Sequence, residues 1–150
     1  MKRYRFIFLF LLFSACNSID KNSPAPAEND IDAAREFIRS ALDGKFAQAR
    51  NYLLPDSSNI QYMAVAERNY QKADDDTKNG YRSASIRIYS PVVHLNDSAT
   101  IIVFSNSFKN DPDTLKILKT KGQWLVDLKY LYEHDMDSSH INFNLRDSLK

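Results

Sequence analysis

Six side chains of this sequence belong to types that carry acid–base chemistry. An enzyme acting on a small molecule needs an acid or base inside an apolar cavity, because burial shifts its pKa. His94 lies near the end of an expected strand and can face inward, whereas Asp127 lies opposite Trp124 and is expected to point to solvent. The other candidates are helical groups that can line a cavity: Tyr52, Tyr62, Glu67 and Tyr70. No two of the six have a spacing that catalysis demands, and buried tyrosines and a lone histidine are usually structural, so we expect no catalytic residue.

Two other stretches gather residue types that bind metals. Residues 134–140 hold two histidines and two aspartates, and residues 74–76 are three consecutive aspartates. Structural zinc sites prefer cysteine and histidine at helical or turn spacings, which residues 134–140 lack, so a flexible acidic tail is the preferred interpretation. Residues 74–76 lack the alternating ligands and the glycine of a calcium loop and are interpreted as a solvated helix end. The sequence therefore predicts neither a metal nor a cofactor.

The only cysteine, Cys16, closes an N-terminal segment organised like an export signal. Residues 1–5 carry three basic side chains, and residues 6–13 form an uninterrupted apolar run. A membrane core about 30 Å thick takes roughly 20 apolar residues to cross, so this run is too short to span it. Its length suits the apolar region of a signal peptide, and small residues precede the cysteine. We expect residues 1–15 to be a signal peptide.

Cys16 and the residues before it resemble the lipobox of bacterial lipoproteins, in which the cysteine thiol is acylated and the chain is cut just before it. Phe13 stands where that motif usually carries leucine. The alternative is an ordinary secretory signal with a chance cysteine. Acyl chains contribute about 0.8 kcal/mol per buried methylene, so an acylated Cys16 would hold the domain on a membrane without a spanning helix. Acylation would also leave the domain without a thiol for disulfides, metals or nucleophilic catalysis.

Residues 16–29 are polar, contain proline and lack periodicity, as expected for a flexible, solvated tether. Asn17, directly after the cysteine, is not the aspartate that retains some lipoproteins at an inner membrane. We expect the protein to be lipid-anchored in the bacterial cell envelope, preferably at the outer membrane. The sequence does not indicate which face of the membrane carries it.

Length and charge describe one ordinary folded domain. A chain of 150 residues is long enough for one domain with a core, but not for two. The formal net charge is +1, but removal of Lys2, Arg3 and Arg5 leaves 17 basic against 19 acidic side chains. Binding to nucleic acid is driven by clustered lysine and arginine, so this near-neutral chain gives no case for a nucleic-acid partner.

Three helices are predicted in the first half of the domain. Residues 30–44 carry a 3.6-residue apolar pattern that Gly44 can close. Residues 46–54 form a second, shorter helix that ends at Pro55 and must pack beside the first. A third helix is expected over residues 60–73, and residues 74–80 are expected to end it before the sheet begins.

Several strands are predicted in the second half. Residues 82–89 alternate apolar and polar side chains, as in a half-buried strand. Pro91 cannot donate to a strand ladder, so it marks an edge, a bulge or a break before residues 92–95. Residues 99–108 are apolar on both faces, which indicates a central strand covered on both sides.

The clearest local signal is a hairpin. Residues 114–119 and 123–130 alternate around a short connection that contains Gly122, which can take the positive φ that the reversal needs. A sheet with one apolar face needs a cover, which the preceding helices can supply. The sequence therefore predicts an α+β domain over residues 30–132, with helices packed on one face of an antiparallel sheet.

The order of these elements resembles an uncharacterised family of bacterial lipoproteins, once labelled lumazine-binding-like, within the nuclear-transport-factor-2-like superfamily. The resemblance rests on residues 33–38, residues 44–50 and the strand with Gly122, Trp124, Val126 and Asp127, within a stretch from Asp30 to Tyr132. It implies a curved antiparallel sheet wrapped on helices into a cone, often with a pocket at its mouth. It brings no established catalytic residue.

The cone fold hosts enzymes, ligand carriers and interaction modules, so fold alone does not assign the function. We expect a non-catalytic module that binds a small apolar ligand or an envelope protein, and the alternative is an enzyme of the isomerase or dehydratase kind. The residues expected to line the pocket are Phe37, Tyr52, Tyr70, His94, Phe104 and Trp124. Residues 133–150 continue beyond the resemblance, and Ile141, Phe143 and Leu145 alternate with polar residues there, which suggests either a last strand at a sheet edge or a disordered terminus.

Overall fold

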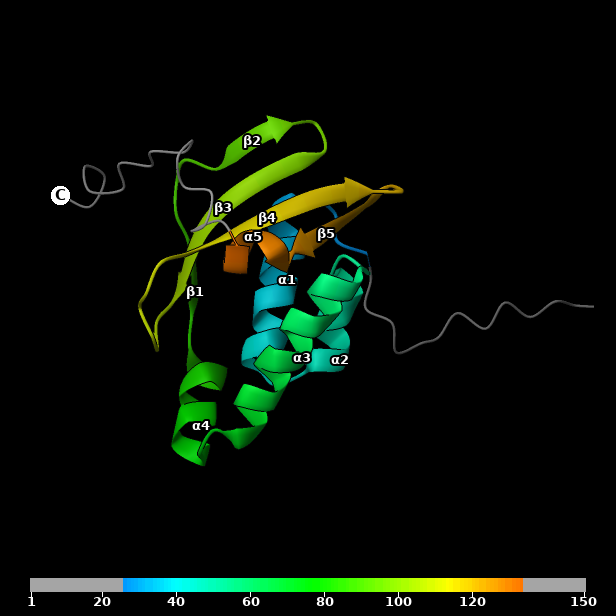
Figure 1. Ribbon diagram of the computed structural model, residues 1–150. Helices are drawn as coiled ribbons and strands as arrows, with labels where there is room; N and C mark the ends of the chain where they lie inside the picture. Colours follow the sequence, from blue (N-terminus) through cyan, green and yellow to red (C-terminus); the bar gives the residue numbers. More distant parts are fainter. Residues whose placement is uncertain (1–25, 134–150) are drawn as a thin grey trace, which may run out of the picture.

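The structure is a computed structural model that describes residues 26–133, and it packs a layer of helices on one face of an open antiparallel sheet (Figure 1). Helices occupy the first half of these residues and strands most of the second, so the predicted α+β class is confirmed. The predicted signal peptide, Cys16, most of the tether and residues 134–150 lie outside the described residues. Within residues 26–133, no helix has the length and apolar character needed to cross a membrane.

Helix α1 (Asp30–Leu42) forms the centre of the helical layer and contacts both the other helices and the sheet. Its start is capped by Asn29, whose side-chain oxygen accepts a hydrogen bond from the backbone N–H of Asp32 at 2.9 Å. The buried face includes Ala33 and Ala34, both fully buried, and these small side chains let the helix approach its neighbours closely. Gly44 follows with φ of 76°, so the helix ends where the sequence predicts.

The second predicted helix is shorter than expected. Helix α2 (Phe46–Ala49) is one turn long and passes into the 3₁₀ turn η1 (Arg50–Tyr52). Leu53 then becomes extended and pairs with Val126 in the sheet, where the N–H of Leu54 donates to the Val126 carbonyl oxygen at 2.9 Å. The chain leaves the helix early because this backbone pairing competes with a further helical turn.

Residues 74–80 do not end the helical half, as the sequence suggested, but belong to a further helix. Helix α3 (Ser57–Lys72) ends at Ala73, and α4 (Asp75–Ser83) follows almost at once. The carboxylate of Asp74 accepts a hydrogen bond from the N–H of Thr77 at 2.6 Å and so caps α4. Two further aspartates in the first turn interact favourably with the positive end of the helix dipole. The aspartate run therefore starts a helix, and the strand expected from residue 82 begins later.

The five strands are β1 (Ile86–Ile88), β2 (Val93–Asn96), β3 (Ala99–Asn106), β4 (Asp113–Thr120) and β5 (Gln123–Asp127). Strand β3 is central, as predicted, with β4 on one side and both β1 and β2 on the other, and β5 pairs with β4. The strands β1 and β2 pair with successive parts of the same edge of β3, and Pro91 lies in the interruption between them. Pro91 therefore marks a break.

The predicted hairpin is present as β4 and β5, joined by Lys121 and Gly122, which both have positive φ. Its second strand is three residues shorter than the predicted 123–130, because helix α5 (Leu128–Glu133) begins at Leu128. The side chain of Asn59 accepts a hydrogen bond from the Leu128 N–H at 2.6 Å, and Asp127 accepts one from the Lys129 N–H at 3.2 Å. These side chains accept the hydrogen bonds that a neighbouring strand would otherwise accept, and the chain turns into α5.

The register assigns the side chains of the sheet to two faces, because residues paired across strands point to the same side. Ile102 pairs with Leu115, and Ile117 pairs with Val126. All four are buried in one core with the apolar side chains of the helices. We call this side the inner face. The intervening residues, among them Ile101, Val103 and Leu125, form the outer face.

Candidate functional site

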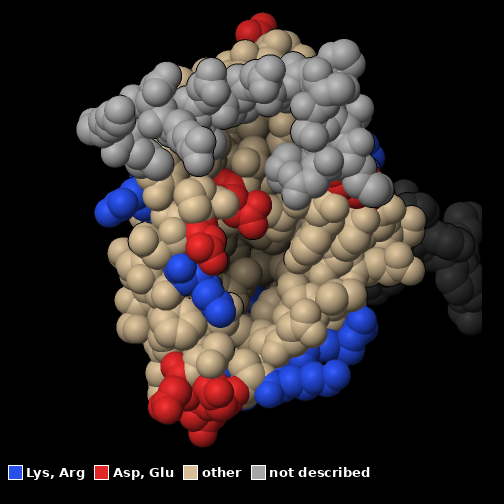
Figure 2. All heavy atoms as spheres, turned by 60° about the vertical axis from the view of Figure 1, so that its left-hand side comes forward, with Lys and Arg blue, Asp and Glu red and all other residues tan. Residues whose placement is uncertain are grey.

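A hollow lies on the side of the molecule that carries β1 and α4. Figure 2 shows this face with a depression at its centre and with acidic and basic side chains around it. Half-buried aromatic and aliphatic side chains pack against the core from both layers. We assign to this hollow, and call the aromatic hollow, those of the half-buried side chains that come from α3, β1, β3 and α5: Tyr62, Ala66, Tyr70, Ile86, Ile88, Phe104 and Leu131.

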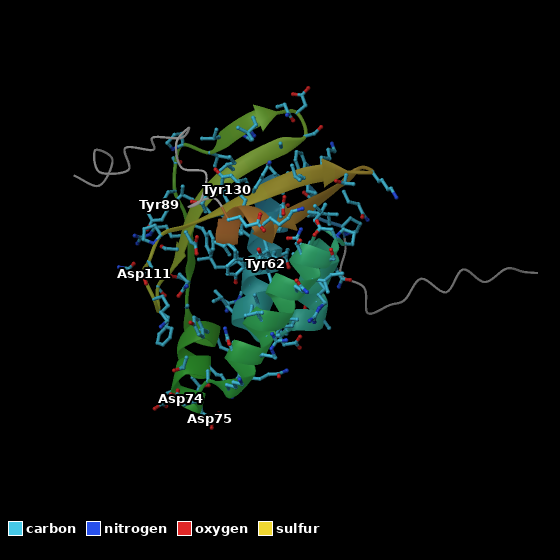
Figure 3. All side chains as sticks on the ribbon, viewed as in Figure 1. Tyr62, Asp74, Asp75, Tyr89, Asp111 and Tyr130 are labelled. Atoms are coloured by element: carbon cyan, nitrogen blue, oxygen red, sulfur yellow. The ribbon has the colours of Figure 1, made fainter. Side chains whose placement is uncertain are left out.

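Two tyrosines join α3 to α5 at this site. The rings of Tyr62 and Tyr132 stack with their centroids 4.6 Å apart and an interplanar angle of 24°. The hydroxyl of Tyr62 donates to the carboxylate of Glu133 at 2.7 Å, and Figure 3 shows this tyrosine on α3. The bond to Glu133 raises the pKa of Tyr62, and burial raises the pKa of Tyr130 and Tyr132. At neutral pH these phenols are therefore uncharged, and they offer aromatic faces and hydroxyl groups.

An aromatic row continues from α2 to the β3–β4 connection. Phe46, Tyr70, Tyr81 and Phe108 follow one another with ring centroids 5.5, 6.2 and 5.1 Å apart. The Tyr70 ring packs directly on Gly44, where an added Cβ would lie 2.6 Å from a ring carbon. The Tyr70 hydroxyl is buried and makes no hydrogen bond to any residue that the structure describes. A buried donor of this kind favours a bound polar group or water.

Charged side chains hold the walls in place. Arg39 of α1 donates to the carbonyl oxygens of Ala84 at 2.7 Å, and of Tyr81 and Arg82 at 3.2 Å, which fixes the junction of α4 and β1 on α1. Arg50 and Glu67 form an ion pair at 2.5 Å that ties η1 to α3. These contacts position both sides of the aromatic hollow without placing their charges in the core.

Five of the six residues predicted to line a pocket lie in the hydrophobic core or pack against it, and His94 is the exception. Phe37 and Tyr52 lie in the core, with 6% and 5% of their surface exposed. Tyr70 and Phe104 are half-buried and belong to the aromatic hollow. Trp124 lies on β5, where the ammonium of Lys119 is 5.3 Å from its ring centroid.

His94 lies at the far end of the sheet, in a polar cluster that the sequence did not reveal. Asp30 accepts a hydrogen bond from the Thr100 hydroxyl, and His94 Nδ1 lies 3.1 Å from Thr100 Oγ1 and 3.4 Å from Asp30 Oδ2. Thr100 is fully buried, but the His94 side chain is 62% exposed. Thr100 precedes Phe104 by four residues on β3, which is roughly 13 Å at strand spacing. His94 is therefore separate from the aromatic hollow.

A second polar network joins α3 to the end of β5. The amide of Asn59, which is fully buried, donates to Asp127 at 3.1 Å and to Asp56 at 2.8 Å. Lys129 completes the network with its ammonium 2.9 Å from the Asp56 carboxylate. Asp127 is only 8% exposed, so the expectation that it points to solvent was wrong. The reason is Asn59, which lies 68 residues away and gives this carboxylate a buried partner.

A search for metal-binding groups and the comparisons with known proteins complete the description of the site. Within residues 26–133, no three His, Cys, Asp or Glu side chains are grouped so that they could hold a metal ion. The histidines and aspartates of residues 134–140 lie outside this range. Protein-family models, curated proteins and solved structures were all compared with the chain, and none matches it.

Proposed function

We propose that this chain is a lipid-anchored module of the bacterial cell envelope that binds a small apolar molecule, without chemical conversion, in the aromatic hollow. The observation that carries the proposal is the set of half-buried aromatic and aliphatic side chains that α3, α5 and the sheet pack against the core. Ligand sites are typically concave and apolar, with a few placed polar groups, and uncharged tyrosines supply such groups here.

The chemistry of the hollow supports binding over catalysis. An isomerase or dehydratase needs an acid or base beside the substrate. His94, the only histidine among the described residues, lies at the other end of the sheet with Asp30 and Thr100. Glu67 is held by Arg50 in an ion pair, and the Glu133 carboxylate accepts the hydrogen bond of the Tyr62 hydroxyl. Aromatic and aliphatic side chains are therefore the main contacts proposed for a ligand.

The proposal includes a nuclear-transport-factor-2-like cone, with the aromatic hollow at its mouth, and an anchor at Cys16. Helices first and antiparallel strands after, with the helices on the inner face, support the cone. The described chain begins at Pro26, on the side of the molecule that carries the β4–β5 turn, whereas β1 and α4 lie on the other side (Figure 1).

The ligand is tested by native mass spectrometry of the protein purified from its own cells. Ala66→Trp fills the aromatic hollow from α3, and Val65→Trp is the matched control because Val65 is 42% exposed on the same helix. We expect a small apolar molecule to be retained by the wild type and the control, and lost from Ala66→Trp. Equal retention by all three, or no retained molecule in any, would contradict the proposal.

The anchor is tested separately by growth with radiolabelled palmitate. We expect label and membrane association in the wild type and neither in Cys16→Ala. A wild-type protein that is unlabelled and released into the soluble fraction would reject the anchor and leave ligand binding to its own test.

A further inference from the structure

Two buried hydrogen-bond donors near α4 make no hydrogen bond to any residue that the structure describes. They are the Nε–H group of Arg39, in the last turn of α1, and the hydroxyl of Tyr70, near the end of α3. Buried polar groups in native proteins are nearly always hydrogen-bonded, because an unpaired group in the interior lowers stability. Both donors are therefore free to bind an acceptor that a ligand brings.

Contacts around Gly44 and Tyr81 bring the two donors to one place. A Cβ added to Gly44, directly after α1, would lie 3.0 Å from the hydroxyl oxygen of Tyr70. Arg39 uses Nη2 to donate to the Tyr81 carbonyl oxygen at 3.2 Å, and the ring centroids of Tyr81 and Tyr70 are 6.2 Å apart. The junction of α1, α3 and α4 thus holds both donors.

This junction borders the aromatic hollow. Tyr70 is itself one of the side chains of the hollow. Arg39 also donates to the carbonyl oxygen of Ala84 at 2.7 Å, two residues before Ile86, which is another side chain of the hollow. Figure 1 shows α4 next to α3, with β1 leading from α4 into the sheet. A ligand among the apolar side chains could therefore reach both donors with a single polar group at its end.

The charges at the junction favour a neutral acceptor. The guanidinium of Arg39 is already paired with the Asp43 carboxylate at 2.8 Å, and it donates to three backbone carbonyl oxygens. Both α1 and α3 end here, and the C-terminal end of a helix carries a partial negative charge. These features disfavour a carboxylate. A neutral carbonyl oxygen has two lone pairs and can accept from both donors.

We propose that the ligand of the aromatic hollow is an apolar molecule with a neutral carbonyl group, a ketone or an ester, whose oxygen accepts hydrogen bonds from Tyr70 and Arg39. This assignment rests on the proposed function and adds the chemical class of the ligand to it. A hydrocarbon of the same shape would fill the same hollow but leave both donors unpaired. Discrimination between the two kinds of molecule is therefore the property to measure.

A pair of molecules of nearly equal shape tests the role of the oxygen. 2-Acetylnaphthalene carries a carbonyl oxygen where 2-isopropenylnaphthalene carries a methylene group. Their dissociation constants are measured by nuclear magnetic resonance titration of the chain from residue 17 onward, which keeps every described residue. We expect the ratio of the two constants, alkene over ketone, to fall about fivefold in Tyr70→Phe, because one hydrogen bond to the ketone is lost.

Tyr89→Phe is the matched control, because it removes a tyrosine hydroxyl that lies 3.0 Å from the Ser105 hydroxyl on the outer face of the sheet. It should leave the ratio as in the wild type. An unchanged ratio in Tyr70→Phe would overturn the carbonyl assignment and indicate that water alone satisfies this hydroxyl. If the wild type binds neither molecule, the assignment also fails, and the native mass spectrum decides separately whether the hollow holds a ligand.

Arg39→Lys tests the second donor, since it keeps the positive charge and removes the Nε–H group. We expect the ratio to fall in this variant too, whereas a ratio equal to that of the wild type would overturn the role of Arg39. Urea unfolding checks that the variant is folded, and if it is not, Tyr70→Phe decides.

The molecule retained from the protein's own cells gives an independent readout. Its exact mass and fragmentation should show a ketone or an ester attached to an apolar body. A retained molecule without oxygen, or a carboxylic acid, would overturn the assignment while confirming that the hollow binds a ligand.

Discussion

The hydroxyl of Thr100 donates a hydrogen bond to the carboxylate of Asp30 at 2.5 Å, and the two residues are 70 positions apart in the chain. Thr100 is fully buried and Asp30 is 8% exposed. The other carboxylate oxygen of Asp30 accepts the Ile31 N–H at 2.8 Å. One side chain thus joins the start of α1 to the central strand.

Replacement of Thr100 by valine should therefore destabilise the protein. The change keeps the shape of the side chain but leaves a buried carboxylate oxygen without its hydroxyl donor, which costs about 1–3 kcal/mol. The free energy of unfolding in urea measures the loss. Thr114→Val, at a half-buried position of β4, is the control and should change the free energy of unfolding by less than about 1 kcal/mol. Equal effects of the two substitutions would count against a special role for the Asp30 contact.

Asn59 should be among the most sensitive polar positions. Its side chain donates to Asp56 and Asp127 and accepts from the Leu128 N–H, so Asn59→Ala leaves buried groups of β5 and α5 unpaired. We expect a loss of about 3 kcal/mol in the free energy of unfolding. Asn51→Ala, at an exposed position of η1, is the control, with an expected change of less than about 1 kcal/mol. A loss below about 1 kcal/mol at Asn59 would show that the network is dispensable.

The stability contributed by Asp56 should depend on pH in the acid range. Its hydrogen bond from the Asn59 N–H, helped by Lys129, lowers the pKa of the Asp56 carboxyl from 3.8 to about 2. A carboxyl whose pKa is lower in the folded state stabilises that state above its unfolded pKa, and the contribution is lost as the pH falls from about 4 towards about 2. Asp56→Asn should therefore flatten the decline of unfolding free energy in this window. Asp111→Asn, in the exposed β3–β4 connection, should leave the decline as in the wild type.

Alanine substitutions at Gly44 and Gly122 can be compared to test how tightly the ring of Tyr70 packs on the backbone. Both have positive φ, of 76° and 81°, so an alanine at either costs about 1–2 kcal/mol in backbone strain. An added Cβ meets no atom within 4 Å at Gly122, but lies 2.6 Å from the Tyr70 ring at Gly44. Thermal or urea unfolding should therefore show a clearly larger loss for Gly44→Ala than for Gly122→Ala. Equal losses would mean that the ring of Tyr70 moves aside without cost.

Local patterns were sufficient to predict some elements. The first helix has a cap, an apolar stripe and a closing glycine within its own sequence, and the β4–β5 hairpin has alternation around Gly122. Both are present because their signals lie within a few residues of one another. The central position of β3 was also predicted from side chains that are apolar on both faces.

The errors arose where distant residues decide the local structure. The end of β5 depends on Asn59 in α3, and the end of η1 depends on Val126 in β5. Helix α4 was missed because its cap, Asp74, was interpreted as part of a helix end. Distant contacts also hold this helix, since its Tyr81 ring packs between the rings of Tyr70 and Phe108. Of the residues predicted to line a pocket, Tyr70 and Phe104 pack half-buried against the core, and their role in a site stays a prediction. His94 was placed with them because strand alternation gives the face of a residue but not its position along the sheet.

The interruption at Pro91 affects whether a strand of another molecule can add to this edge of the sheet. An open sheet presents a free edge, and a long regular edge strand is a template onto which a strand of another molecule can add. One of the two edges here consists of β1 and β2, three and four residues long, with a residue between them that has no N–H to donate. An incoming strand would find no continuous ladder to extend along this edge, so a second copy of the domain should not add a strand there.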